Sequence, residues 1–386
     1  MRARWYRSYT DIAADAWNRL AGDDIPFLRH EYLCALEESG SACAASGWTP
    51  RPIVIEDRAG QALGAAPLWL KSHSFGELVY DFAWAEAHAR TGLNYYPKLI
   101  AALPFSPVTS PRLLVAPEAD RAAVSDRLIS AARELANDSG ASSLHWLFTD
   151  DADTRVLERH GFLHRTAVQF HWQNPGYTSF GDFLTGFTAE KRKKLKRERR
   201  QVCDAGIVTE VLTGHELTPA LWDAFYELYA GNILRHGGMI HLTRDFFTRL
   251  GRTFPEAMVL VLARRGKEIV GAAFNLRGAD ALYGRYWGGR PSIRSLHFET
   301  CYYTPIEYCI AHDLRRFEGG AGGEHKLARG FLPVVTHSAH WLRHPQFTHA
   351  VADFLRREQR SVAHYVDELN EHVPFRNMIS AADERR

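Results

Sequence analysis

Two stretches of the chain share one pattern of apolar and polar positions. Residues 53–71 and 259–277 each contain an apolar run, a charged turn with one glycine, and a second apolar run entered through Gly-Ala-Ala. Two apolar runs joined by a short polar turn with glycine predict a β-hairpin. Because the second stretch repeats the order of the first, we expect two domains of related design. Independent convergence on the same hairpin is the alternative.

Each predicted hairpin is followed by a similar series of elements. Residues 77–84 and 281–288 both contain Tyr-x-x-x-Trp among apolar residues, and each is expected to form a third strand. A tyrosine pair and a proline come next, at residues 95–97 and 302–305. Proline is favoured at the first position of a helix, so we expect a helix to begin at each proline.

Further elements complete both halves. Thr304 and Glu307 have the spacing of a capping box, and apolar residues continue at helical spacing over 305–316. The first half is expected to contain a strand, a helix and another strand, over residues 143–149, 152–160 and 163–173.

The chain is long enough for two domains. It has 386 residues, and Asn-Pro-Gly at 174–176 is typical of a turn or linker. We therefore expect an α+β fold with domains at 1–176 and 177–386, each a mostly antiparallel sheet flanked by helices. The second domain would carry the active site.

Composition narrows the class of protein. Apolar residues make up 46% of the chain and charged residues 24%, as in an average globular protein. No apolar run approaches the roughly 20 residues of a membrane span, so stable membrane insertion is not expected. The N-terminus lacks the pattern of a signal peptide.

The five cysteines are scattered without C-x-x-C, which argues against a disulfide framework and favours the reducing cytoplasm. Nothing indicates the oligomeric state.

Charge is concentrated in one segment. The net charge is +2, yet residues 191–200 hold eight basic residues and one acidic residue. Apolar residues at approximate helical spacing run through and beside this segment, so an amphipathic helix with a cationic outer face is expected. Such a face indicates phosphate contact, with a nucleic acid backbone or a phosphorylated cofactor. The candidate contacts are Arg192, Lys193, Lys196 and Arg200.

The segment Arg-Tyr-Trp-Gly-Gly-Arg at 285–290 is a candidate phosphate site. A loop here would expose the backbone N–H groups of Gly288 and Gly289, with Arg285 and Arg290 beside them. The alternative is a glycine turn with two solvated arginines.

His297 and Glu299 are candidates for a general base. In an extended segment, residues two apart face the same side, and either group could take a proton from an amine. The alternative is a pair that fixes the entrance of a helix. Together with Cys301 these residues could bind a metal, but they show no recognised ligand spacing, and no metal is expected.

The stretch 317–331 places four glycines before Glu324, His325, Lys326 and Arg329. Because leucine follows Lys326, the stretch does not match a Walker-type nucleotide loop. On a strand, Glu324 and Lys326 would point to one face and could form a catalytic pair. An edge strand with ion pairs and a phosphate cradle are the alternatives.

Several of these runs, taken in order, resemble the FemAB-like family of predicted N-acyltransferases. This family is grouped with the peptidoglycan-bridge aminoacyltransferases and the wider GNAT superfamily. The resemblance covers about residues 5–375. The runs that carry it lie at 95–114, 191–200, 282–289, 296–310 and 322–331.

The resemblance implies two tandem GNAT-like domains. It places Arg285-x-x-Gly288-x-Arg290 where that superfamily binds the pyrophosphate of the acyl donor, although Arg290 stands where a small residue is usual. It also implies that the basic helix matches one in Fem-type enzymes, whose donor is an aminoacyl-tRNA. Acyl-CoA or aminoacyl-tRNA would be a co-substrate, and no tightly bound cofactor is expected.

The expected activity is transfer of an acyl or aminoacyl group to an amine on a small molecule or peptide, with tRNA as a possible partner. His297 or Glu299 would act as the base, and Lys326, Arg285 or backbone N–H groups would stabilise the oxyanion. A non-catalytic module that binds peptidoglycan precursor, peptide or RNA is the alternative. The remaining residues expected at the cleft are Tyr303 and Glu324 as catalytic groups and Tyr286, Trp287, His325 and Arg329 as substrate contacts.

Overall fold

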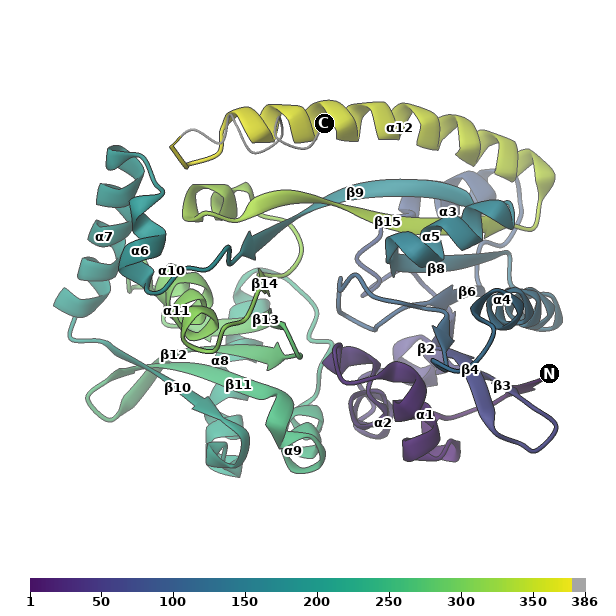
Figure 1. The fold of residues 1–386 in the computed structure, drawn as a ribbon, viewed down its shortest axis with the longest axis horizontal. Coiled ribbons are helices and arrows are strands. Elements are labelled where there is room, and N and C mark those ends of the chain that lie inside the picture. The colour runs from purple at the N-terminus through teal and green to yellow at the C-terminus, as the bar shows by residue number, and fades with distance from the viewer. Residues whose placement is uncertain (377–386) are drawn as a thin grey trace. The chain divides into compact units, whose positions relative to one another are not determined.

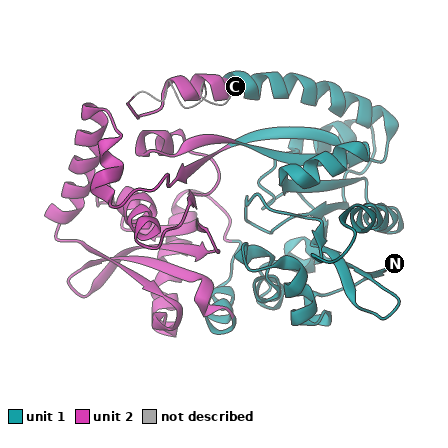
Figure 2. Cartoon of the chain, in the orientation of Figure 1, with its two compact units in different colours: residues 1–168, 241–253, 335–364 teal, residues 169–240, 254–334, 365–386 magenta. Residues whose placement is uncertain are grey.

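The structure, a computed structural model, describes residues 1–376 (Figure 1). The chain forms two compact units (Figure 2). Unit 1 contains residues 1–168, 241–253 and 335–364, and unit 2 contains, of the described chain, residues 169–240, 254–334 and 365–376. Both units combine helices with β-sheet, so the mixed α/β fold predicted from the sequence is confirmed.

The units are discontinuous in sequence, whereas two contiguous domains were predicted. The first passage between them falls between Val168 and Gln169, inside strand β9 (Leu163–Gln173) rather than in the turn at 174–176. Residues 241–253 and 335–364 then belong to unit 1. Local patterns reveal the type of an element but not the sheet that it joins, so this return of the chain leaves no local signal.

Unit 1 has an antiparallel sheet and a second sheet in which β6 and β8 run parallel. The first has the order β1 (Arg2–Trp5), β3 (Ile53–Glu56), β4 (Ala62–Ala66) and β7 (Leu114–Val115). The second contains β2 (Trp48–Pro50), β5 (Leu68–Lys71), β6 (Lys98–Ala101), β8 (Ser143–Thr149) and the unit 1 part of β15 (Leu332–Leu342). The helices are α1 (Ala14–Ala21), α2 (His30–Glu38), α3 (Phe82–Arg90), α4 (Arg121–Asp138), α5 (Asp151–Arg159), α9 (Arg244–Thr253) and most of α12 (Pro345–Glu371).

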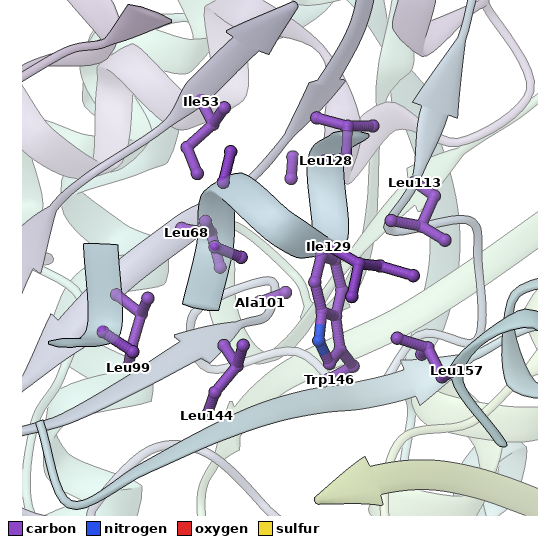
Figure 3. Packing of buried hydrophobic residues seen from close by; sticks show 14 of the residues in the cluster. Ile53, Leu68, Leu99, Ala101, Leu113, Leu128, Ile129, Leu144, Trp146 and Leu157 are labelled. Carbon is purple, nitrogen blue, oxygen red and sulfur yellow. The ribbon is translucent and has the colours of Figure 1, made fainter. Parts of the chain in front are cut away.

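The core of unit 1 lies between its sheets and helix α4. The Asp120 side chain caps this helix by accepting hydrogen bonds from two N–H groups of its first turn. Apolar residues at helical spacing then form a buried face. Figure 3 shows Leu128 and Ile129 of α4 among Ile53, Leu68 and Trp146, all 0% exposed.

Unit 2 is built on one sheet. Its strands follow the order β10 (Val208–Thr213), β11 (Met258–Arg265), β12 (Glu268–Arg277), β13 (Ala281–Gly289), β14 (Arg316–Glu318) and the end of β9. All neighbours are antiparallel except β13 and β14, which are parallel. The helices are α6 (Phe180–Thr185), α7 (Ala189–Asp204), α8 (Pro219–Arg235), α10 (Leu296–Phe298), α11 (Thr304–Ala311) and the end of α12. A π-helical turn, Glu299–Tyr303, joins α10 to α11, and a 3-10 helix spans Glu324–Arg329.

The strongly periodic segments were predicted correctly. Both hairpins are present, as β3–β4 and β11–β12. The strand around Tyr283-x-x-x-Trp287 is β13. The three expected elements at the end of the first half are β8, α5 and β9, within one residue at each end.

Three local predictions were wrong. Residues 77–84 do not form a strand, because α3 begins at Phe82. No helix begins at Pro97, since β6 starts at the next residue and pairs with strands on both sides. Thr304 and Glu307 do not form a capping box. Helix α11 continues directly from the π-helical turn and has no free N-terminus to cap.

The packing of α8 on β13 yields a test of the fold. A Cβ atom at Gly288 would overlap the main-chain carbonyl of Leu228, which cannot move without shifting α8. We expect Gly288→Ala to lower the free energy of unfolding by about 1–3 kcal/mol, the usual cost of overpacking. Gly231→Ala on the same helix is the control, because its Cβ would make only ordinary contact, 3.5 Å from Arg235. It should be neutral or stabilise by about 1 kcal/mol. Urea denaturation measures both, and a Gly288→Ala protein as stable as the parent would contradict this packing.

Candidate functional site

Two parallel strands of unit 2 separate after a short pairing. β13 and β14 pair at three positions, the last being Tyr283 with Glu318. β13 continues to Gly289 with β12 on its other side, while the chain leaves β14 through the glycines of 319–323. The backbone of 284–287 therefore has no β14 partner in the described structure. Backbone groups at such an opening can hydrogen-bond a ligand.

A cavity of about 250 Å³ lies at this opening, and we call it the strand cavity. Helix α8, strands β12 and β13 and the helical segment 296–303 supply its walls. Its lining residues are Tyr229, Asn232, Ile233, Ala273, Phe274, Asn275, Gly284, Arg285, Tyr286, Trp287, His297, Cys301, Tyr302 and Gly319.

A β-bulge places Arg285 at the strand cavity. Phe274 pairs with Tyr286 and Asn275 pairs with Gly284, so Arg285 is the extra residue of β13. Bulges redirect side chains, and they are common beside active sites. The Arg285 side chain is 3% exposed, and its Nη1 donates to the Gly284 carbonyl at 2.8 Å. A guanidinium held in this way can stabilise negative charge that develops in the cavity.

The loop expected at 285–290 is instead the end of β13. Gly288 and Gly289 are buried and pair with Ala272 and Gly271. The missing side chain of Gly288 allows the close approach of α8. Gly288 therefore serves the packing of α8, and the predicted contact of Gly288 and Gly289 with a donor stays a prediction.

A second cavity of about 590 Å³, the arginine cavity, shares Asn232, Trp287 and His297 with the strand cavity. Arg235 and Arg290 bring two cations to it. Arg235 donates to the Gly289 carbonyl at 2.9 Å, and Arg290 pairs with Glu268 at 3.0 Å. The other lining residues are His236, Gly289, Pro291, Ile293, Ser295 and Phe298.

His297 and Glu299 point to different cavities, because the segment is helical rather than extended. His297 lines the strand and arginine cavities, whereas Glu299 lines a separate one. Arg199 donates to both oxygens of Glu299, with Nη2 2.8 Å from Oε1 and Nε 3.1 Å from Oε2. Glu299 therefore anchors α7, and only His297 is placed to accept a proton in the strand cavity.

Burial sets the charge state of His297. The pKa of His297 is lowered from 6.5 to about 4. Desolvation is the largest cause, and the nearby His325, Arg329 and Lys326 lower the pKa further. The imidazole is therefore neutral at pH 7 and has one nitrogen free to accept a proton. A neutral imidazole beside a cavity can accept a proton, but a pKa of about 4 makes it a weaker base than an ordinary histidine.

A tyrosine–histidine pair lies at the same wall. The Tyr302 hydroxyl is 2.9 Å from Nε2 of His325, and Tyr302 lines the strand cavity. Burial raises the pKa of Tyr302 and lowers that of His325, so both are neutral. Such a pair can transfer a proton. The sequence named His325 but not Tyr302, because only the folding of 319–331 brings the two together.

Tyr303 and Arg329 lie away from the strand cavity. Tyr303 is fully buried and donates to Glu198 of α7, which also accepts from Arg329 at 2.9 and 3.0 Å. The Arg329 guanidinium lies 3.3 Å from the centre of the Phe298 ring. These residues position α7 and the helical segment against each other.

Glu324 and Lys326 do not lie on a strand, so that prediction was wrong. Positive φ angles at several of the preceding glycines turn the chain into the 3-10 helix. Lys326 donates to the carbonyls of Gly320 and Gly322 at 2.7 and 2.6 Å. These bonds close the turn formed by residues 319–323, which we call the glycine turn. The pKa of Lys326 is lowered to about 8, mainly by burial and further by the positive charge of Arg285. Glu324 accepts from Tyr365 at 2.7 Å and lines another cavity.

The basic segment is helical as predicted, in α7, and its role in donor binding stays a prediction. Within residues 1–376, no three His, Cys, Asp or Glu side chains are grouped as a metal site would require. No helix of the described chain combines the length and apolar character of a membrane span.

Comparisons with known proteins agree with this fold. The FemAB-like family model, described as peptidoglycan biosynthesis/recognition, matches residues 8–377. No curated protein matches the chain. The crystal structure of FemX is 11% identical, with a TM-score of 0.56, and the match covers 91% of this chain and all of FemX.

Two further solved structures are similar over most of the chain. The C-terminal domain of a putative lysylphosphatidylglycerol synthetase from Agrobacterium fabrum is 10% identical, with coverage of 92% and 98% and a TM-score of 0.54. A tandem GNAT protein from the clavulanic acid biosynthesis pathway is 15% identical, with coverage of 89% and 99% and a TM-score of 0.46. At these identities, the FemX and synthetase matches show a shared fold.

The environment of His297 predicts an unusual titration. We expect its ring to protonate near pH 4 in an NMR titration, with the signal assigned by comparison with His297→Gln. Because the folded-state pKa lies below the ordinary value of 6.5, the unfolded chain binds the proton first. The free energy of unfolding should therefore fall as the pH drops from about 6.5 to 4, and His297→Gln should reduce that fall. Titration of this ring near 6.5 would contradict the buried site.

Proposed function

Because the chain belongs to the FemAB-like family, we propose that it is an N-acyltransferase. The donor is an activated acyl or aminoacyl ester or thioester, either acyl-CoA or aminoacyl-tRNA. The acceptor is an amine on a small molecule or peptide, and a peptidoglycan precursor peptide agrees with the family description.

The separation of β13 from β14 is the observation that carries this proposal. Residues 284–287 line a cavity there, and the same cavity is lined by His297, by the Tyr302 hydroxyl-bearing side chain and by Arg285. Acyl transfer to an amine needs such a set: a proton acceptor, a proton donor and a group that stabilises an oxyanion.

In the proposed mechanism, the amine nitrogen attacks the donor carbonyl and forms a C–N bond. Neutral His297 accepts the proton that the nitrogen loses. Arg285 and backbone N–H groups of β13 stabilise the oxyanion. As the carbon–sulfur or carbon–oxygen bond of the donor breaks, Tyr302 gives its proton to the leaving group.

His325 orients Tyr302 in this step. With hydrogen on Nε2, His325 donates to the Tyr302 oxygen across the observed 2.9 Å, and the hydroxyl hydrogen can face the cavity. The proton collected by His297 restores the hydroxyl after turnover. The role of Lys326 is structural, because its hydrogen bonds hold the glycine turn that positions His325.

The arginine cavity is the proposed position of the donor phosphates. Either donor class carries phosphate, and Arg235 and Arg290 supply cations beside the shared residues Trp287 and His297. Arg290, named from the sequence as a donor contact, lines this cavity. Phosphates bound in the arginine cavity would lie next to the proposed reacting groups, because the two cavities share lining residues.

Product analysis tests the proposal. A panel of acyl-CoA thioesters and charged tRNAs is incubated with mixed amines, and mass spectrometry detects the acylated product. We expect Tyr302→Phe and His297→Gln each to lower the rate by about 10²-fold or more, the usual contribution of a general acid or base. Tyr308→Phe in α11, which does not line either cavity, is the control and should retain the parent rate. Donor binding with no product from either donor class would instead make the chain a recognition module.

A further inference from the structure

One buried side chain of the strand cavity uses only half of its polar atoms. Asn275 of β12 is 1% exposed and lines the cavity. Its Nδ2 donates to the carbonyls of Val259 and Ala273, at 3.3 and 3.1 Å. These two acceptors fix the orientation of the amide, because an oxygen in the place of Nδ2 would face two carbonyl oxygens. The other end of the amide, Oδ1, is therefore an acceptor.

None of the described residues donates a hydrogen bond to Oδ1 of Asn275. Buried polar atoms of side chains are normally hydrogen-bonded. Gly284, which also lines the cavity, lies beside this oxygen, since a Cβ atom there would be 3.2 Å from Oδ1. The φ angle of Gly284 is not in the left-handed region, so its backbone does not require glycine. The missing side chain makes room for the Phe317 ring and leaves Oδ1 open to the cavity.

An open acceptor inside a cavity discriminates among ligands. In the free protein a solvent molecule can donate to Oδ1, and a ligand that displaces it must supply a hydrogen of its own. A hydrocarbon group in the same position would leave Oδ1 buried without a partner, which weakens binding. Sites of this kind reject analogues that lack the hydrogen-bond donor. The strand cavity therefore favours a ligand group with an O–H or an N–H.

The charges around the strand cavity favour an uncharged group. Arg285 is a cation at its wall, and no Asp or Glu is among the described residues that line it. Glu318, beside Arg285, is not part of the lining, and Arg316 lies 3.1 Å from it. Burial next to a cation would make a ligand ammonium unfavourable. A hydroxyl or an amide N–H satisfies Oδ1 without adding a positive charge.

Asn275 belongs to the part of the strand cavity that the arginine cavity does not share. The two cavities have Asn232, Trp287 and His297 in common, whereas Asn275 and Gly284 line only the strand cavity. With the donor phosphates in the arginine cavity, as proposed above, the acyl end of the donor is the part that reaches Asn275.

We propose that Asn275 selects the acyl group of the donor, and that this group carries a hydroxyl or an amide N–H that donates to Oδ1. The inference rests on the proposed acyl transfer for the identity of the ligand, but binding tests it without turnover. Asn275 is then a specificity-determining residue. It holds the acyl group and takes no part in the proton transfers of His297 and Tyr302.

Matched acyl groups test this selection. Each is carried on CoA as a thioester and on the terminal ribose of tRNA as an ester, and its equilibrium affinity for the full chain is measured without an amine acceptor. The hydroxyl pair is lactyl and isobutyryl, and the amide pair is N-acetylglycyl and levulinyl. Within each pair a methyl or methylene group replaces the O–H or N–H. We expect the parent to bind the hydrogen-bonding member of at least one pair about 10- to 100-fold more tightly.

Asn275→Leu removes the acceptor at similar volume. It also loses the hydrogen bonds of Nδ2, so its overall affinity can fall, but the affinity ratio within a pair cancels such general losses. We expect that ratio to fall to about one. Asn232→Leu is the matched control, because Asn232 lines the part of the cavity shared with the arginine cavity. It should keep the ratio of the parent.

Gly284→Ala covers Oδ1 while Asn275 stays unchanged. The added Cβ would lie 3.2 Å from Oδ1 and 3.1 Å from the Phe317 ring. We expect the affinity ratio to fall about tenfold, and urea denaturation shows whether the variant is folded.

Three results would overturn the inference. The parent could bind both members of each pair equally, which would show that nothing is selected. Asn275→Leu could keep the ratio of the parent, which would place the selection elsewhere. Alanyl groups in their ammonium form could bind more tightly than lactyl groups, which would show that the selected group is a cation.

Failure of the proposed function gives a different result. A parent that selects between the matched groups but forms no product with any amine would keep this inference and refute the transfer. Absence of binding on both CoA and tRNA would overturn both.

Discussion

The three-residue parallel pairing of β13 with β14 is the constraint on which the candidate site depends. Had the pairing continued, the backbone of 284–287 would be covered and no strand cavity would exist. A buried charge cluster marks the point of separation. Glu318 is 2% exposed, Arg316 lies 3.1 Å from it, and Arg285 lies 3.9 Å away. Burial raises the pKa of Glu318, and the two guanidiniums oppose that effect. Beyond this cluster, the glycine turn closed by Lys326 leads the chain away from β13.

One helical segment serves two different surfaces of unit 2. Residues 296–303 present His297 and Tyr302 to the strand cavity and Glu299 and Tyr303 to α7. The contacts that position α7 therefore also fix the wall that carries the proposed base and acid. A disturbance of Arg199 would reach both surfaces, because it binds Glu299 within this segment and Glu307 in the next helix.

The sequence predicted elements well where one periodicity governs a whole segment. Both hairpins and the strands β8 and β9 follow from apolar runs, and the basic segment is helical as expected. Prediction from the sequence failed where tertiary contacts determine the local secondary structure. Lys98 enters a sheet despite the preceding proline, and the helix after Tyr303 needs no cap. Within the site, Arg285, Trp287 and His297 were named and do line cavities. Tyr302 and Asn275 were missed, since only the packing of α8, β12 and the glycine turn brings them to one place.

Hydrogen–deuterium exchange with a bound donor tests the central claim most directly. The parent chain is compared alone and with a non-transferable analogue of acyl-CoA or of aminoacyl-tRNA. If the opening between β13 and β14 holds the donor, amide exchange should slow in residues 284–287 and in the helical segment 296–303. Slower exchange confined to unit 1 or to α7, with no change in these two segments, would contradict the account.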